Sequence, residues 1–404
     1  MSALISEPCD PDPALGAKSP EARPESRAQT PAPKDITLTP VTGDQSPETG
    51  VGVAKYNERQ TPMQIIDLIY PSNKIVSIVG TFKNAGKTVT LNEIILEAGE
   101  RGIPIALIST GRDGEKRDVL TETEKPPVYV EKGTIITTVE NAIKPEYAGI
   151  EILHVTDYNT PMGRVVIGRA MEKGYVEISG PYSARTVRNI CEKMMEFGAK
   201  LVLIDGSLDR RASAAPFISD GTVLATGASL ARSQDLVIDK TLHIIKNYSI
   251  PKIENELVGD IAQDIIEQGI TGVIDEDCSV TYIDTLTSLQ SGDDISKQIS
   301  KKTEYVVLSG SATTCTLLDI MQNAKGKLKV IIKDGTRVFL PERELHLLNK
   351  MGMELRVIDN INIIAITVNP YSPDGYYFDA KSFLENMRKA IPHIPVFDVM
   401  QKGF

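Results

Sequence analysis

Two hydrophobic patterns alternate along the chain after about residue 61. Short continuous apolar runs, typical of strands buried on both faces of a parallel sheet, occur at 74–80 (KIVSIVG), 104–110 (PIALIST), 200–206 (KLVLIDG) and 221–227 (GTVLATG). Between and after them, apolar residues recur every three or four positions, which predicts helices at 88–102, 182–198 and 234–247. Strands that alternate with helices predict an α/β fold with a mostly parallel sheet.

A second series of the same kind follows residue 250. The pattern predicts strands at 279–286, 304–311, 327–334 and 361–370, and helices at 293–302, 313–324, 341–352 and 379–390. We place a boundary near Pro251 and expect one αβ domain at 61–250 and a second, C-terminal αβ domain at 251–404. A chain of 404 residues agrees with this division, since domains hold roughly 100–200 residues each.

The segment from 111 to 181 lies between the second and third predicted strands of the first series. It is longer than an ordinary connection and contains further apolar runs, such as GIEILHVTDYN at 149–159. Two interpretations stay open: the segment carries a switch or lid, or it adds strands that complete the sheet.

Residues 1–60 differ from the rest of the chain. They are rich in Pro, Ser, Thr, Ala, Glu and Asp, and such a composition buries too little apolar surface to offset the entropy lost on ordering. We therefore predict a disordered N-terminal tail, whose role is open. Directly after it, TPMQIIDLIY predicts a short helix with Thr61 as N-cap and Pro62 at the first helical position.

Charge and composition exclude several classes of function. The formal net charge is −10, which disfavours binding to a nucleic-acid backbone. The sequence has neither an apolar stretch of about 18 residues nor an N-terminal secretory signal, so we expect a cytoplasmic protein without a membrane span. The four cysteines and four histidines are scattered, which predicts reduced, mostly buried thiols and argues against a His/Cys metal cage.

Candidate chemistry begins where the first predicted strand ends. The sequence GTFKNAGKT runs from Gly80 to Thr88, between a strand and a helix. It resembles the phosphate-binding pattern G-x-x-x-x-G-K-[ST], with one additional residue between the two glycines. In such a loop the backbone N–H groups and the N-terminus of the following helix face the phosphates of a nucleotide.

Each residue of this motif has an expected role. Gly86 allows close approach of the backbone, and Lys87 reaches the β- and γ-phosphate oxygens. The hydroxyl of Thr88 is a candidate Mg²⁺ ligand. The expected binding loop also includes the following residues: Gly80, Thr81, Asn84, Ala85 and Val89.

Acidic residues after two other strands are candidate partners of the loop. Asp205 ends the strand at 200–206 and has the form of a Walker B aspartate, which holds Mg²⁺ directly or through water. Asp113, in the loop after the strand at 104–110, is a candidate for positioning the attacking water, and a solvated charge is the alternative.

Three further stretches are expected near the carboxyl edge of the sheet, where open α/β sheets bind ligands. Asp209, Arg210 and Arg211 follow the third strand, and an arginine there would bind phosphate or form a surface ion pair. Asp220 precedes the fourth strand, and we place it at the same edge as Gly227 and Ser229. The segment 367–373 (TVNPYSP) follows the last strong strand and is interpreted as a contact to a base or partner, or as a rigid turn.

The form G-T-x-x-x-x-G-K-T resembles that of dethiobiotin synthetase, of the cobyrinic and cobyric acid synthases and of other P-loop proteins that include MinD-type ATPases. The resemblance covers residues 74–250 and implies a P-loop nucleotide-binding domain with ATP and Mg²⁺ as cofactors. GTPases of this fold carry N-K-x-D, and the nearest match, NKMG at 349–352, lacks the aspartate and lies in the second series. ATP is therefore preferred over GTP.

Five stretches together support a narrower resemblance. They are SIVGTFKNAGKT, LVLIDGSLDRRASAAP, DGTVLATGASL, ITVNPYSP and IPVFDVM. They resemble P-loop proteins that accompany adenosylcobalamin-dependent lysine 5,6-aminomutase or ornithine aminomutase, regarded as components of an ATP-dependent reactivating factor. This resemblance covers residues 70–404 and implies a chaperone-like ATPase whose partner is the aminomutase or a companion subunit. A dethiobiotin synthetase-like ligase and a nucleotide-gated scaffold without turnover remain as alternatives, and a homodimer stays open.

Overall fold

The computed structural model describes part of the chain, namely residues 63–110, 128–143, 147–160, 163–206, 214–283, 292–324 and 326–401. The predicted tail at 1–60 lies outside the described residues. Within the described residues, no helix combines the length and the apolar character that crossing a bilayer requires.

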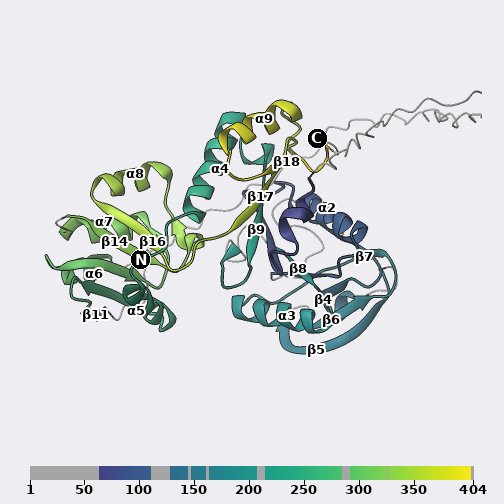
Figure 1. Cartoon of the computed structure of the whole chain (residues 1–404), viewed down its shortest axis with the longest axis horizontal. Helices are drawn as coiled ribbons and strands as arrows, with labels where there is room; N and C mark the ends of the chain where they lie inside the picture. The colour runs from purple at the N-terminus through teal and green to yellow at the C-terminus, as the bar shows by residue number, and fades with distance from the viewer. Residues whose placement is uncertain are drawn as a thin grey trace, which may run out of the picture. The chain divides into compact units, whose positions relative to one another are not determined.

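Nine strands form the larger sheet in the order β18-β17-β9-β1-β8-β2-β4-β6-β5 (Figure 1). Their bounds in chain order are β1 Ile75–Gly80, β2 Ile105–Ser109, β4 Ile135–Val139, β5 Ile150–Thr160, β6 Gly163–Ala170, β8 Leu201–Asp205, β9 Gly221–Gly227, β17 Ile363–Asn369 and β18 Val396–Phe397. From β18 to β4 all neighbours pair in parallel, and β6 and β5 continue the sheet with antiparallel pairing. The sheet confirms the predicted α/β class, and β4 to β6 show that the segment at 111–181 adds strands to it.

Helices cover this sheet according to the alternation of side chains along its strands. Helices α1 (Ile65–Ile69) and α2 (Lys87–Glu100) pack on one set of buried strand residues, which includes Val76 and Ile78 of β1. Helix α3 (Ala184–Glu196) packs on the alternate set, which includes Ile75. Successive residues of a strand point to opposite faces, so a continuous apolar run supplies core to both layers.

Two helices cover the part of the sheet that contains β9, β17 and β18. Helix α4 (Gln234–Tyr248) and helix α9 (Ala380–Ala390) contact each other and share one core cluster with these strands (Figure 1). The cluster joins elements from distant parts of the sequence, with Leu224 of β9 and Phe383 of α9 among its buried members.

A second sheet has five strands in the order β11-β10-β12-β14-β16. Its strands are β10 Thr271–Asp275, β11 Val280–Ile283, β12 Thr303–Leu308, β14 Leu328–Ile332 and β16 Met353–Val357. Its helices are α5 Glu256–Glu267, α6 Gly292–Gln298, α7 Thr314–Asn323 and α8 Glu342–Lys350. Helix α5 packs with Val307 of β12, whereas α6, α7 and α8 pack with Val306, so this sheet too is covered on both faces.

Two further pairs of short strands complete the strands in the described part of the chain. Strand β3 (Val128–Val130) pairs antiparallel with β7 (Gly174–Val176), and β13 (Ala312–Thr313) pairs parallel with β15 (Val338–Phe339).

The division of the chain between the two sheets differs from the predicted boundary. We expected residues 251–404 to form one C-terminal domain, but β17 pairs with β9 of the first sheet. The five-stranded sheet is formed by residues 271–357, and its chain enters and leaves at adjacent points, because Lys252 and Val357 form a parallel bridge. Pairing between distant segments causes this return of the chain, and local hydrophobic patterns do not encode it.

The ends of the helices agree with the sequence in one case and differ in another. Helix α2 begins directly after Gly86 and its chain leaves through Gly102, whose φ is 62°. The first helix begins at Ile65 with Gln64 as N-cap, and Gln64 and Asp67 form a capping box. The predicted start with Thr61 and Pro62 lies outside the described residues.

Candidate functional site

The loop at 80–88 joins β1 to α2 at the carboxyl edge of the larger sheet. Its backbone takes the left-handed conformation at two positions, Asn84 with φ 59° and Gly86 with φ 99°. A Cβ atom at Gly86 would lie 3.1 Å from Cβ of Asn369, the last residue of β17. Both the positive φ and the close neighbour explain why the sequence has glycine at this position.

The side chain of Lys87 crosses the end of β1. A Cβ atom on Gly80 would lie 3.0 Å from Cδ of Lys87, so the missing side chain of Gly80 provides the space for this path. The Nζ atom donates a hydrogen bond to the carbonyl oxygen of Gly206 at 2.6 Å. The ammonium group is therefore held between the ends of β1 and β8, with two further N–H donors beyond the one it uses.

Thr88 and Asp205 flank this hydrogen bond along the chain. Thr88 follows Lys87 in the first turn of α2, and Asp205 precedes Gly206 at the end of β8. Both are half-buried, and Asp205 lies in register with Ile78 of β1 and Ser109 of β2. One hydroxyl and one carboxylate fit Mg²⁺, which prefers oxygen ligands and keeps several ligands from outside the protein.

Within the described part of the chain, no three His, Cys, Asp or Glu side chains gather into a group that could hold a metal ion. The donor set around Thr88 and Asp205 is therefore too small for an all-protein metal cage. It fits a metal ion that arrives with the phosphates of a nucleotide.

Thr81 anchors the start of the loop through a chain of buried hydroxyl groups. Its hydroxyl donates to Thr226 Oγ1 at 3.0 Å, Thr226 and Thr241 Oγ1 lie 2.8 Å apart, and Thr241 donates to the carbonyl oxygen of Val237 at 2.7 Å. The backbone N–H of Thr81 donates to Ala225 O at 2.8 Å. Each hydroxyl has a single proton, so the three donate in one direction, from the loop through β9 to α4.

The other predicted loop residues differ in their exposure and in their hydrogen bonds. Ala85 is buried and its N–H donates to Phe82 O, whereas the side chain of Val89 is 43% exposed. The carbonyl oxygen of Asn84 accepts a hydrogen bond from Asn369 Nδ2 at 3.3 Å. Asn84 and Ala85 therefore shape the loop, and Val89 faces outward from the first turn of α2.

The sequence predicted no specific role for Asn369. It lies within the segment 367–373, which was interpreted as a base contact or a rigid turn. A Cβ atom on Gly227 would lie 2.3 Å from Asn369 O, so the ends of β9 and β17 touch beside the loop. The pairing of β17 with β9 brings Asn369 to Gly86, and only the position of this segment after a strand could have indicated it.

One candidate lies at the opposite edge of the sheet. Asp220 was expected beside Gly227, but its Oδ2 accepts hydrogen bonds at 2.9 Å from the N–H groups of Lys74 and Ile75, where β1 begins. This expectation was wrong because a residue that precedes a parallel strand lies at the amino edge. Asp220 fixes the start of β1 and takes no part in the loop.

Four other candidates cannot be placed. Asp113, Asp209, Arg210 and Arg211 lie outside the described residues. Their expected roles in positioning water and in binding phosphate stay predictions.

The cysteines agree in part with the expectation of buried thiols. Cys191 is buried in α3, and burial raises the pKa of its thiol to about 12, against a smaller lowering by the charge of Arg188. Cys278 is half-buried, and Cys315 is exposed at the start of α7. The prediction of a buried thiol is therefore wrong for Cys315.

The fold places the chain among α/β proteins with a large, mostly parallel sheet. No protein-family model matches this chain, and neither the curated proteins nor the solved structures gave a match. The resemblances drawn from the sequence motifs therefore stay predictions.

Proposed function

We propose that this protein binds a nucleoside triphosphate with Mg²⁺ at the loop 80–88 and hydrolyses it, with ATP as the preferred nucleotide. One observation carries the proposal: the side chain of Lys87 crosses Gly80, and its ammonium group donates to the carbonyl oxygen of Gly206, the residue that follows Asp205. A cation, a helix N-terminus and an acidic residue thus meet at the carboxyl edge of a parallel sheet, where α/β proteins bind ligands.

The helix that follows the loop supports the binding of an anion. The N-cap of α2 is Gly86, which has no side chain to accept hydrogen bonds from the first N–H groups of the helix. These N–H groups lack acceptors within the helix, and the helix dipole makes their surroundings positive. A phosphate group would supply the missing acceptors and the opposite charge.

In this proposal each residue has one task. Lys87 would exchange its bond to Gly206 O for the terminal phosphate oxygens and stabilise the charge that develops there during transfer to water. Thr88 and Asp205 would hold Mg²⁺, which when bound supplies charge neutralisation at the phosphates. Asp113 remains the proposed residue for orienting the attacking water.

The narrower proposal is a reactivating component for a cobalamin-dependent amino-acid aminomutase. It is supported by the five stretches named above, one of which contains the loop itself. In this role nucleotide binding and hydrolysis would shift the protein between two conformations with different affinities for the mutase. The five-stranded sheet and its helices would supply the surface that meets the mutase or a companion subunit.

Substitution of the lysine tests the nucleotide site. In Lys87→Ala we expect Mg-ATP to bind roughly tenfold to hundredfold more weakly, because a hydrogen bond to a charged group contributes about 1.5–3 kcal/mol. Isothermal titration calorimetry measures the affinity, and phosphate release measures turnover. Lys74→Ala is the matched control, since Lys74 is an exposed lysine at the opposite edge of the sheet. Equal affinity in wild type and Lys87→Ala would refute the site.

The dependence of turnover on a partner separates the functional alternatives. Phosphate release that requires the aminomutase with inactivated cobalamin supports the reactivating role. Release that requires a small carboxylate or diamine supports the ligase, and tight binding without release supports the scaffold.

A further inference from the structure

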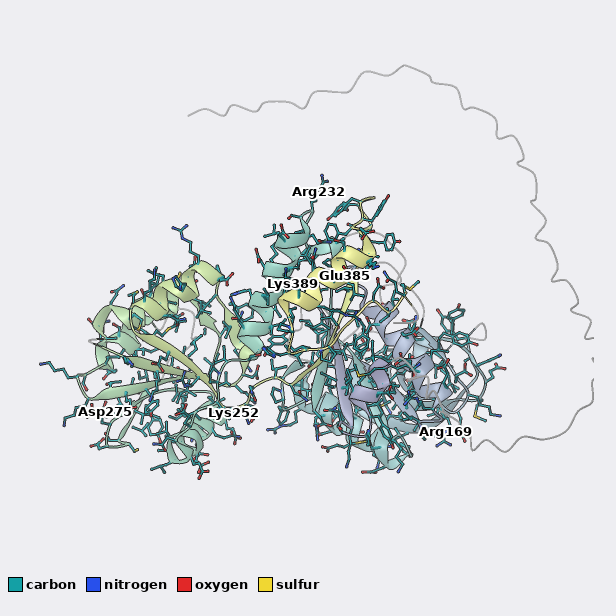
Figure 2. The ribbon with its side chains drawn as sticks, turned by 45° about the horizontal axis from the view of Figure 1, so that its top comes forward. Arg169, Arg232, Lys252, Asp275, Glu385 and Lys389 are labelled. Carbon is teal, nitrogen blue, oxygen red and sulfur yellow. The ribbon has the colours of Figure 1, made fainter. Side chains whose placement is uncertain are left out.

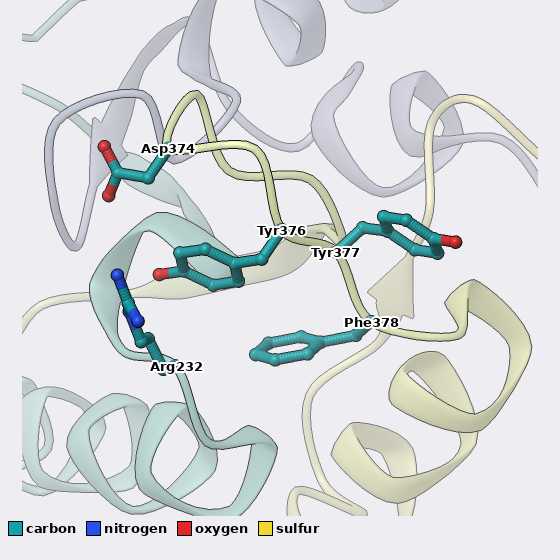
Figure 3. A pocket seen from close by; sticks show the side chains of 5 residues that line it. All are labelled: Arg232, Asp374, Tyr376, Tyr377 and Phe378. Atoms are coloured by element: carbon teal, nitrogen blue, oxygen red, sulfur yellow. The ribbon is translucent and has the colours of Figure 1, made fainter.

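A pocket of about 340 Å³ lies at the carboxyl edge of the larger sheet, beyond the ends of β9 and β17. It is lined by Arg232, Asp374, Tyr376, Tyr377 and Phe378 (Figure 3). Its volume is at the lower end of the range for small-molecule sites, which is roughly 300–1,000 Å³.

The pocket is connected to the loop through the ends of two strands. The chain that forms one wall continues from Asn369, which packs against Gly86 and donates to Asn84 O. The hydroxyl of Tyr376 donates to Ala228 O at 2.7 Å, directly after the end of β9. Both walls therefore follow strands that end at the same edge as β1, where the loop begins.

The side chains of the pocket combine a flat surface with two charges. The guanidinium carbon of Arg232 lies 5.5 Å from the ring centroid of Tyr376, and the two side chains face each other (Figure 3). Tyr377 points to the other side of the same chain, away from Arg232 (Figure 3). Arg232 lies two residues before α4, and its side chain projects outward (Figure 2).

Arg232 and Asp374 offer complementary hydrogen-bonding groups. A guanidinium only donates hydrogen bonds, and an ionised carboxylate only accepts them. Within the described part of the chain, neither side chain forms an ion pair, and both are exposed enough to meet a ligand. A flat aromatic molecule with acceptors on one part of its rim and donors on another would match both.

We propose that this pocket binds the purine base of the nucleotide whose phosphates occupy the loop. The inference rests on the proposed function, because it takes the loop as the phosphate site. A purine fits against the Arg232–Tyr376 pair, and its rim carries ring-nitrogen acceptors for the guanidinium N–H groups and N–H donors for Asp374. Adenine and guanine share this chemistry, so the experiment distinguishes them.

The experiment compares nucleotides with inorganic tripolyphosphate, which has the phosphates without the base. Calorimetry on the full chain with Mg²⁺ measures the affinities for ATP, GTP, CTP and tripolyphosphate. We expect one purine nucleotide to bind at least about tenfold more tightly than tripolyphosphate, since stacking on one aromatic side chain contributes roughly that factor. The better of ATP and GTP identifies the base.

Variants assign the preference to the pocket. Arg232→Ala and Tyr376→Leu should lower the affinity for the purine nucleotide about tenfold and leave that for tripolyphosphate unchanged, which also shows that the variants fold. Lys381→Ala removes an exposed lysine from α9, away from the residues that line the pocket, so this variant should bind as wild type does.

Each outcome decides a different point. Equal affinities for tripolyphosphate and all nucleotides would overturn the base pocket and leave the proposed phosphate site standing. A purine preference that survives both Arg232→Ala and Tyr376→Leu would place the base elsewhere and overturn the inference. Absence of binding by all four ligands would overturn the proposed function and the inference together.

Discussion

Glu97 shows how a single buried carboxyl group connects two helices. Its side chain is 5% exposed in α2, and its Oε2 accepts a hydrogen bond at 2.9 Å from the backbone N–H of Ile66 in α1. Burial raises the pKa of this carboxyl above its ordinary value of 4.5, the bond from Ile66 acts in the opposite direction, and the charge of Glu93 raises it further. Glu97 thus holds α1 on α2 but resists ionisation.

The raised pKa has a definite effect on stability. In the pH range above 4.5 the folded protein binds more protons at Glu97 than the unfolded chain does, so this contribution to stability is lost as pH rises through the folded pKa. Glu97→Gln keeps an acceptor for Ile66 and cannot ionise. We therefore expect its melting temperature, relative to wild type, to rise as the pH increases from about 4.5 to about 8.

Thermal unfolding across this pH range checks the prediction. Glu100→Gln, an exposed change on the same helix, should run parallel to wild type. Parallel curves for Glu97→Gln as well would show that the carboxyl ionises as freely in the folded protein as in the unfolded one.

The start of α2 differs from the starts of several other helices. The N-caps of helices α5, α7 and α9 are Asn255, Thr313 and Asp379, whose side chains accept hydrogen bonds from the first helical turn. The N-cap of α2 is Gly86, which has no side chain that could accept such a hydrogen bond. Relative to a side-chain cap, glycine at this position costs only roughly a few tenths of a kcal/mol, and the first N–H groups of α2 have no side-chain acceptor from the N-cap.

Two glycines in similar conformations allow the cost of backbone strain to be compared with the cost of a close contact. Gly86 and Gly102 lie at the two ends of α2 with positive φ, but a Cβ atom would meet Asn369 only at Gly86. Gly102→Ala should cost about 1–2 kcal/mol of stability, the strain of the left-handed conformation. Gly86→Ala should cost more than this and also weaken Mg-ATP binding.

Chemical denaturation measures both stabilities, and calorimetry measures nucleotide binding. Equal losses of stability in the two variants would show that Asn369 does not restrict the loop. Unchanged nucleotide affinity in Gly86→Ala would show that the close approach of the backbone is not needed for binding.

The whole molecule is organised by a chain that leaves the larger sheet and returns to it. The backbone of Val357 accepts from Ile253 and donates to Pro251, each at 3.0 Å, so the two connections of the five-stranded sheet run side by side. After this crossing the chain supplies β17, α9 and β18 to the larger sheet. The larger sheet therefore depends on both ends of the described sequence.

This organisation makes opposite predictions for two shortened chains. Removing residues 252–357 and joining the ends with a short glycine–serine linker should leave the larger sheet folded, because its ends already meet. Ending the chain at residue 250 should prevent folding, because it exposes β9 and the buried cluster around Leu224, which β17 and α9 cover. Circular dichroism and the cooperativity of thermal unfolding distinguish the two outcomes. Cooperative unfolding of the chain that ends at residue 250 would refute the prediction.

The sequence determined those features that depend on neighbouring residues. Continuous apolar runs located β1, β2, β8 and β9, because strands buried on both faces need apolar residues at every position. The position of Gly86 and Lys87 between a strand and a helix located the loop, since strand, turn and helix are contiguous in the chain. Asp205 was placed correctly at the end of β8 for the same reason.

Only the tertiary structure decided which distant segments meet. The return of β17 to β9, the contact of Asn369 with Gly86 and the pocket between Arg232 and Tyr376 join residues more than 140 positions apart. Such contacts arise from strand order and packing of the whole chain, and many orders satisfy the same local hydrophobic pattern. The sequence alone therefore located the loop at 80–88, whereas the structure defined what surrounds it.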